Sequence, residues 1–352
     1  MSRQDSELVV RPDSGLVQEL ESRFRATCTH ETIEAAELAW AAPLWDSLRA
    51  DGFTTVGLPE EFGGSGGSVV DACAVLRTAG RHAAPVPLAE SGLLGGWAAQ
   101  VLGTELPDGL TVVANAPGVA PGSPLTGRVA GVPWARAADH LVLALDGGEV
   151  VLIGQESVRV EAHSNLAGEP RDLVVLDGAV PLAAASYSSE DRERLVRLGA
   201  LSRVALSAGA LERLVDLSVE YTGQRRQFGR PISRFQAVQA HLVALAEISA
   251  LATMSADVAA AAVERGGGHY EVACAKSVVA GESAPATRAA HQAHGAMGMT
   301  REYPLHHYSR RLRSWATEYG DARTWNDVLG RTVRALGADS LYPFVTEPAI
   351  AG

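Results

Sequence analysis

Guanidinium groups gather in the segment 225–232, where Arg225 stands three residues before Phe228 and a glycine turn, with Gln236 a few residues later. A planar guanidinium can bond two oxygens of a pyrophosphate at once. The segment therefore indicates a site for a phosphorylated ligand, placed where one helix ends and the next begins. The alternative is a solvated basic turn with Phe228 packed into the core, and the arginines alone favour that alternative.

Small residues follow Gln292 at the expected end of a later helix. Gly295 and Ala296 stand in this stretch, which runs to Met299. Because such residues lack bulky side chains, another backbone or a ligand can approach the chain closely. The alternative is a glycine that simply ends the helix.

Other kinds of chemistry find little support in the sequence. We find no Glu-x-x-His pair for a di-iron centre, no zinc-ligand spacing, no nucleophile elbow and no dinucleotide-binding glycine fingerprint. Lys276 is the only lysine, so a Walker-type phosphate loop is absent. The doublet His306–His307 lies in a charged stretch, and we expect a solvated pair there rather than a metal site.

The elements that position these residues can be read from the spacing of apolar side chains. Apolar residues recur at helical spacing over about 14–102 and again over about 189–336, whereas short apolar runs between about 110 and 184 indicate strands. The C-terminal pattern predicts helices over about 189–221, 235–265 and 270–294, and a fourth after Asp321. We therefore expect a mainly α protein with a β insert: an N-terminal helical domain (1–105), a small middle β domain (106–187) and a C-terminal four-helix bundle (188–352).

Composition narrows the class of protein. The net charge of −11 disfavours binding to nucleic acid, because neutralising phosphates needs a basic surface. The three cysteines are far apart and the N-terminal residues form no apolar segment, so a reducing, cytoplasmic location is expected. The apolar stretch 245–263 is interrupted by Glu247 and Asp257, and we expect no membrane span.

Together, and in this order, the two segments resemble motifs of the acyl-CoA dehydrogenase family. Residues 225–236 match its Arg-x-x-Phe-Gly-x-Pro-Ile-x-x-x-Gln motif, and 292–298 match Gln-x-x-Gly-(Gly/Ala)-x-Gly, followed by Glu-Tyr-Pro. Residues 45–66 resemble the N-terminal signature of the family. The resemblance covers most of the chain and implies FAD-dependent α,β-dehydrogenation of an acyl-CoA thioester by a tetramer, with electron-transferring flavoprotein as the usual acceptor.

The resemblance implies a cofactor role for six residues. In this family one subunit's helical bundle grips the ADP half of the FAD held by its neighbour. Arg225 would then pair with the pyrophosphate, Phe228 would pack beside the adenosine, and Gln236 would hydrogen-bond nearby. Gln292 and Gly295 would line the dinucleotide, and Ala296 stands where a second glycine is usual.

The family's catalytic base is missing from its expected positions. The usual glutamate lies nine residues after an arginine and just before a glycine, which here gives Tyr319 after Arg310. Glu318 lies one residue before this expected position, and a shift by one residue rotates a helical side chain by about 100°. Some members carry the base on the first helix of the bundle, at a position that falls on Gly199, which has no acid.

The β domain departs from the family too. Residues 114–124 keep little of the usual Thr-Glu-Pro-x-x-Gly-Ser-Asp stretch, and Gly131-Val132-Pro133 stands in place of Trp-Ile-Thr. Proline has no backbone N–H to donate to a flavin ring.

Three hypotheses about function follow from these matching and missing motifs. The first is a subunit of a heteromeric acyl-CoA dehydrogenase, as in some bacterial enzymes for steroid-type thioesters, in which a homologous partner supplies the base. The second is a homotetrameric dehydrogenase with a displaced base, Glu318 or Asp321. The third is a flavin-free scaffold without enzymatic activity. The residues expected to bind the cofactor are all present, which favours the heteromeric subunit over the scaffold. The lost flavin contacts favour the heteromeric subunit over the homotetramer.

Overall fold

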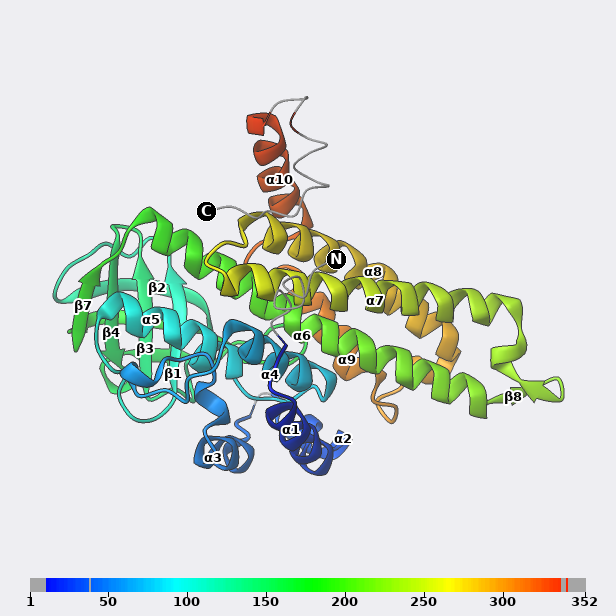
Figure 1. Cartoon of the computed structure of the whole chain (residues 1–352). Helices are drawn as coiled ribbons and strands as arrows, with labels where there is room; N and C mark the ends of the chain where they lie inside the picture. The colour runs from blue at the N-terminus through cyan, green and yellow to red at the C-terminus, as the bar shows by residue number, and fades with distance from the viewer. Residues whose placement is uncertain (1–10, 38, 337–339, 341–352) are drawn as a thin grey trace.

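The computed structural model describes residues 11–37, 39–336 and 340 of the chain. Helices occupy the N-terminal and C-terminal parts, and two small sheets lie between them in sequence and at one end of the molecule (Figure 1). The predicted fold class, mainly helical with a β insert and a C-terminal helical bundle, is confirmed. The domain limits at 105/106 and 187/188 fall between secondary-structure elements, and the division itself stays a prediction.

The N-terminal helices pack through apolar faces such as that of α1, where Leu20 and Phe24 are fully buried. The helices are α1 (Ser14–Thr27), α2 (His30–Ala35), α3 (Ala42–Ala50), α4 (Val69–Arg81) and α5 (Leu94–Leu102). The glycine-rich segment 63–67 forms a loop before α4. A π-helical turn, Ala89–Leu93, precedes α5 and buries Glu90, and turns of this kind often occur at functional sites.

The β region consists of a four-stranded sheet of order β1-β3-β4-β7 and a three-stranded sheet of order β2-β6-β5. The strands are β1 (Thr111–Ala116), β2 (Leu125–Pro133), β3 (His140–Leu145), β4 (Glu149–Gly154), β5 (Arg159–Glu161), β6 (Arg171–Ala179) and β7 (Ala183–Ser186). Only the β1–β3 pair is parallel among these strands. Apolar runs predict β1, β3, β4 and β6, but they do not predict β2, whose glycines and exposed Arg128 interrupt the pattern.

The C-terminal bundle contains the four predicted helices and one more. They are α6 (Ser189–Gln224), α7 (Gln236–Glu264), α8 (His269–His294), α9 (Leu305–Trp315) and α10 (Ala322–Leu336). Ser188 and Asp191 form a capping box at the start of α6, and Gly268 separates α7 from α8 with a positive φ of 90°. The sequence pattern does not predict α9 because polar side chains, among them His307 and Arg311, occupy part of its buried face.

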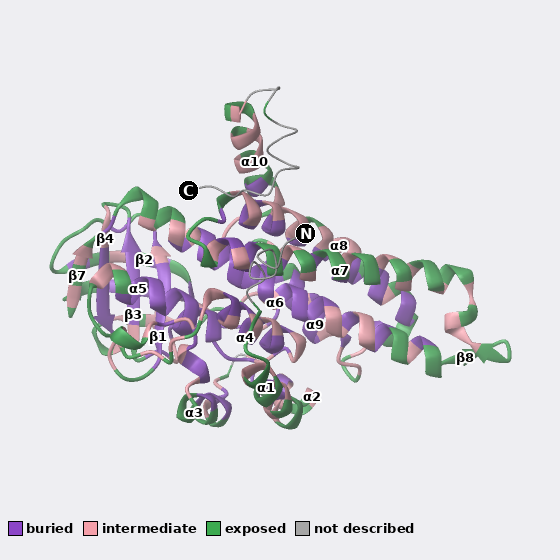
Figure 2. Ribbon diagram, in the orientation of Figure 1, coloured by how far each residue is buried: buried purple, intermediate pink, exposed green. Residues whose placement is uncertain are grey.

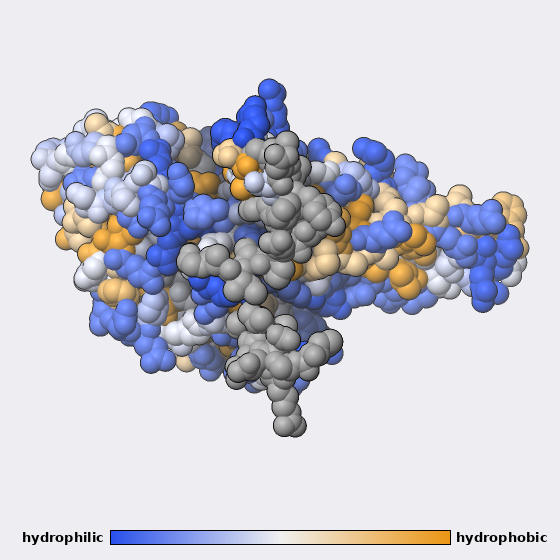
Figure 3. All heavy atoms as spheres, turned by 45° about the horizontal axis from the view of Figure 1, so that its top comes forward, coloured by the Kyte–Doolittle hydropathy of each residue, from blue (hydrophilic) through white to orange (hydrophobic). Residues whose placement is uncertain are grey.

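One face of α7 is apolar and exposed. Val243, Leu251, Met254 and Val258 are between 39% and 58% exposed, and their spacing places them on one side of the helix. Figure 2 shows exposed residues along α7, and Figure 3 shows apolar surface on the extended helical part of the molecule. By length and composition alone α7 could cross a membrane, as the core helix of a soluble protein also could. The expectation of no membrane span stays a prediction.

The long helix α6 connects two separate regions of interest. It runs from the β region to the small hairpin labelled β8 at the far end of the bundle (Figure 1). Gly199 and Arg225 are 26 residues apart, so at 1.5 Å per residue they lie about 39 Å apart along the helix axis. Two sites at these positions are too far apart for one dinucleotide to span.

Candidate cofactor-binding and active sites

The arginine-rich turn is a two-stranded hairpin at the tip of the bundle. Its strands are β8 (Arg226–Gln227) and β9 (Arg230–Pro231), and the turn residues Phe228 and Gly229 both have positive φ, at 49° and 79°. Such a pair of positive φ angles is typical of a type I′ turn, which tolerates glycine well and phenylalanine poorly. Phe228 is 90% exposed, and its nearest ring is that of Phe235, with centroids 6.1 Å apart. The alternative of a phenylalanine buried in the core is therefore wrong.

A groove of about 630 Å³ joins this hairpin to the end of α8. Five of the six residues expected to hold the cofactor line it: Arg225, Phe228, Gln292, Gly295 and Ala296. The sixth, Gln236, is the exposed first residue of α7 and is not among the lining residues. The structure thus brings together two motifs that are about 60 residues apart in sequence.

The groove suits the ADP half of a dinucleotide in charge and in shape. The guanidinium of Arg225, at the C-cap of α6, is exposed and forms no ion pair with any described residue. A phosphate could therefore take both of its hydrogen-bonding edges. Gly295 has a φ of 59°, and no atom lies within 4 Å of the position a side chain would take, so the backbone there is open to a ligand. The methyl group of Ala296 is exposed and leaves this approach open.

A second cavity, of about 540 Å³, lies between the β region and the bundle. Ala114, Asn115, Gly131 and Pro133 line it from the β side, and Glu318 and Tyr319 line it from the segment after α9. Several positions at which the sequence analysis expects departures from the family's substrate and flavin contacts thus line one cavity.

The ring of Tyr319 closes one side of this cavity. Tyr319 has a positive φ of 55°, and its ring packs against the backbone of Gly199 on α6. Burial raises the pKa of the Tyr319 phenol to about 12, although Arg203 lies 5.3 Å from the ring centroid. The phenol therefore stays protonated at neutral pH and cannot accept the α proton of a thioester.

Glu318 is held by two arginines. Its Oε1 accepts from Arg171 Nε at 2.9 Å, and its Oε2 accepts from Arg171 Nη2 at 3.0 Å and from Arg203 Nε at 2.6 Å. Burial opposes ionisation, but the two guanidinium groups outweigh it and lower the pKa of Glu318 to about 2. A carboxylate stabilised to this extent is a weak base.

These two arginines belong to a larger set of paired charges that the sequence does not reveal. Arg203 also donates to the buried Glu90 at 2.6 Å, and Arg171 lies 3.4 Å from Glu169. Glu169 in turn accepts from the Trp315 indole at 3.0 Å. Glu90 and Arg203 each stand among apolar and small neighbours in the sequence, which is a signal that could have found these two, whereas Glu169 and Arg171 lie close to other charged residues. Charged side chains thus border the cavity where an acyl chain would need apolar walls.

Asp321, the second candidate for a displaced base, lies outside the cavity lining. It is exposed at the start of α10, where its Oδ1 accepts from the backbone N–H of Thr324 at 2.8 Å. Hydrogen bonds to Thr324 lower the pKa of this carboxyl. Its role is that of a helix cap.

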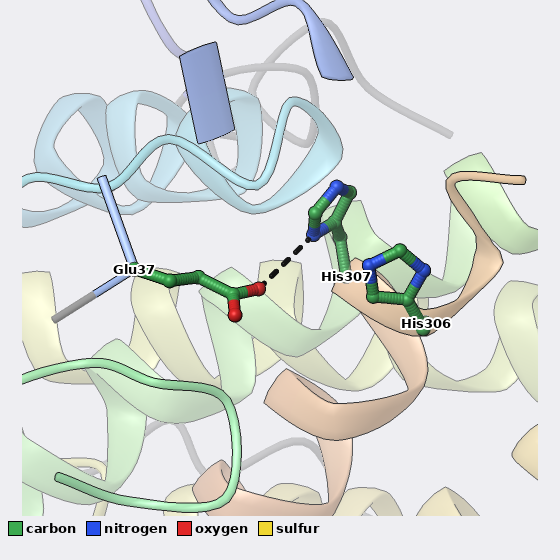
Figure 4. Close-up of side chains that lie close together, drawn as sticks. All are labelled: Glu37, His306 and His307. Carbon is green, nitrogen blue, oxygen red and sulfur yellow. Dashed lines mark ion pairs between the residues drawn. The ribbon is translucent and has the colours of Figure 1, made fainter. Parts of the chain in front are cut away.

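The histidine doublet is not solvated, contrary to expectation. The His307 side chain is fully buried, and His306 is partly buried beside it (Figure 4). Burial, together with the neighbouring His306 and Arg311, lowers the pKa of His307 to about 2. The prediction failed because the segment around α2, remote in sequence, covers this part of α9: His30 lies 2.8 Å from His307.

Comparison with known proteins places the chain in a family. The N-terminal domain of acyl-CoA dehydrogenase matches residues 17–106, and the C-terminal domain of acyl-CoA dehydrogenase matches residues 194–331. The chain belongs to the acyl-CoA dehydrogenase family of flavoprotein oxidoreductases, which act on CH–CH bonds of acyl-CoA thioesters.

Particular relatives agree with this assignment. The chain is 27% identical to acyl-CoA dehydrogenase FadE28 of Mycobacterium tuberculosis, over 81% of this chain and 91% of the relative. It is 30% identical to acyl-CoA dehydrogenase IpdE2 of Mycolicibacterium smegmatis, over 83% and 89%. Among solved structures, the ChsE4-ChsE5 complex from Mycobacterium tuberculosis contains a chain that matches with a TM-score of 0.80 at 25% identity, over 92% of this chain and 97% of that one.

Proposed function

We propose that this chain is the base-lacking subunit of a heteromeric acyl-CoA dehydrogenase. It grips the ADP half of an FAD bound mainly by a homologous subunit, and that homologue supplies the glutamate that removes the α proton. The proposal depends mainly on the arrangement of the side chains around the cavity beside α6. There, Tyr319 covers Gly199, and Glu318 is neutralised by Arg171 and Arg203.

The distance along α6 supports a cofactor shared between subunits. On α6, Arg203 lines the cavity and Arg225 lines the groove, and these residues lie about 33 Å apart along the helix axis. We therefore infer that a dinucleotide in the groove extends toward another chain. When bound, FAD supplies the acceptor for the hydride that leaves the β carbon. The residues of this chain then serve to bind and orient the dinucleotide: Arg225 at the phosphates, Phe228 beside the adenosine, and Gly295 along the dinucleotide.

The exposed apolar face of α7 supports an assembled state. A stripe formed by Val243, Leu251, Met254 and Val258 is unfavourable in water and is typical of an interface between subunits. One similar solved structure is a complex of two differently named proteins, ChsE4 and ChsE5. A homologous acyl-CoA dehydrogenase subunit is the partner we propose, in a tetramer that passes electrons to electron-transferring flavoprotein.

A specific observation argues against each of the two competing hypotheses, the homotetramer and the scaffold. A homotetramer would need Glu318 or Asp321 as base, but the first is held by two arginines and the second caps a helix. A flavin-free scaffold gives no reason for an open groove beside an arginine without an ion-pair partner among the described residues. The cytoplasmic location stays a prediction.

Co-expression tests the proposal. We would purify the chain alone and together with a homologous acyl-CoA dehydrogenase subunit that carries the family glutamate, and record flavin absorbance and its bleaching by acyl-CoA thioesters. FAD retention and bleaching only in the mixed complex are expected. Bleaching by the chain alone would establish the homotetramer instead, and a stable mixed complex without flavin would establish the scaffold.

A further inference from the structure

We propose that Glu37, His306 and His307 bind a divalent transition-metal ion of the Zn²⁺ type. The three side chains come from two places that are remote in sequence, the segment after α2 and the first turn of α9. One potential ligand atom from each lies within 4.8 Å of the other two. Figure 4 shows the carboxylate of Glu37 pointing toward His307, with the ring of His306 alongside.

Each imidazole is fixed through one nitrogen, and its other nitrogen forms no hydrogen bond with the part of the chain that the structure describes. His306 Nδ1 donates to the carbonyl of Tyr303 at 3.0 Å, and His307 Nε2 lies 2.8 Å from His30 Nδ1. His306 Nε2 and His307 Nδ1 are buried and have no hydrogen-bond partner among the described residues. Metal-binding histidines usually show this arrangement, in which a bond at one nitrogen orients the other toward the ion.

A buried nitrogen without a partner is unfavourable, and a bound cation would remove the cost. An unsatisfied buried polar atom destabilises the folded chain, and two such nitrogens occur side by side here. Neutral imidazole is the form that binds metals.

Glu37 provides the third ligand and negative charge. Its Oε1 lies 3.6 Å from His307 Nδ1, and the carboxylate also pairs with Arg310. A carboxylate offers about four lone-pair sites, so it can bind a cation while it still accepts from the guanidinium. In such a site Arg310 would orient the carboxylate, as hydrogen-bonded partners of metal ligands do.

The mixture of ligands selects the class of ion. Two imidazole nitrogens and one carboxylate suit zinc and its neighbours such as cobalt, whereas calcium and magnesium prefer oxygen ligands only. Three protein ligands leave one tetrahedral position for water. The ion would join the N-terminal helices to α9, so its binding would also stabilise the folded chain by mass action.

Zinc binding by the untagged chain, alone or in its natural complex, tests this inference independently of catalysis. After removal of metal with a chelator, we would titrate with Zn²⁺ and, in parallel, record the visible absorption of added Co²⁺. We expect one ion per chain with a dissociation constant on the order of 1 µM or tighter, and the Co²⁺ spectrum of a tetrahedral site.

The variants His306→Gln and Glu37→Gln should each weaken zinc binding by about tenfold or more. The matched control is His163→Gln, which removes an exposed histidine elsewhere and should bind as the wild type does. Circular dichroism verifies that each variant is folded. Equal affinity in the wild type and the folded His306→Gln variant, or absence of stoichiometric binding in the wild type, would overturn the inference.

Discussion

The ring of Tyr319 packs against Gly199, so the two positions at which the resemblance to the family predicts a catalytic base lie in contact in this chain. A methyl group on residue 199 would overlap three atoms of the ring, Cγ, Cδ1 and Cε1. The absence of a side chain at one base position is therefore what allows the bulky residue at the other. The two departures from the family pattern depend on each other.

Gly199→Ala should destabilise the chain by about 1–3 kcal/mol, because the added methyl group overpacks a buried contact. Alanine is otherwise better than glycine inside a helix by roughly 1 kcal/mol. Gly223→Ala is the matched control: it lies on the same helix with nothing near its side-chain position, and should be neutral or stabilising. Urea unfolding measures both. Tyr319→Ala should relieve the cost in the double variant, and a Gly199→Ala variant as stable as Gly223→Ala would show that the contact is wrong.

Tyr319→Phe and Glu318→Gln should leave turnover of the assembled enzyme within a few-fold. A general base contributes roughly 100- to 10,000-fold to the rate, and neither a phenol with a pKa of about 12 nor an arginine-bound carboxylate can act as one here. Steady-state rates with acyl-CoA, at equal flavin content, provide the measurement. The positive control is the glutamine variant of the partner's glutamate. A loss of 100-fold or more in Glu318→Gln, with FAD retained, would make this chain a dehydrogenase with a relocated base.

The paired charges around Glu318 should make stability depend on pH in the acid range. Arg171 and Arg203 lower its folded pKa from 4.5 to about 2. The stabilisation is therefore complete above about pH 4.5 and is lost as the pH falls toward 2. The difference corresponds to about 3 kcal/mol. Free energies of unfolding for wild type and Glu318→Gln, measured between pH 2 and 7, should converge at the acid end. A constant difference over this range would mean that Glu318 is not held as described.

The sequence predicts the cofactor groove better than the cavity, for a physical reason. Arg225, Phe228 and Gly295 lie where helices end. The turns at such places can be predicted from the types and spacing of neighbouring residues. The partners of Arg203 are 113 and 115 residues away, and only the packed fold selects them from the many acids in the chain. The burial of His307 depends in the same way on the remote residues around α2.

Arg225→Ala should weaken FAD retention in the mixed complex by about thirtyfold. Removing a charge-assisted contact to phosphate costs on the order of 2 kcal/mol, and 1.4 kcal/mol corresponds to a factor of ten in affinity. Arg226→Ala is the matched control, since Arg226 is the adjacent exposed arginine but does not line the groove. Flavin released on dilution, followed by fluorescence, gives the affinity, and size-exclusion chromatography verifies that the complex is intact. If both variants retain FAD as the wild type does, the groove does not hold the pyrophosphate. If both lose it equally, general basic charge is sufficient, and the specific contact through Arg225 is excluded.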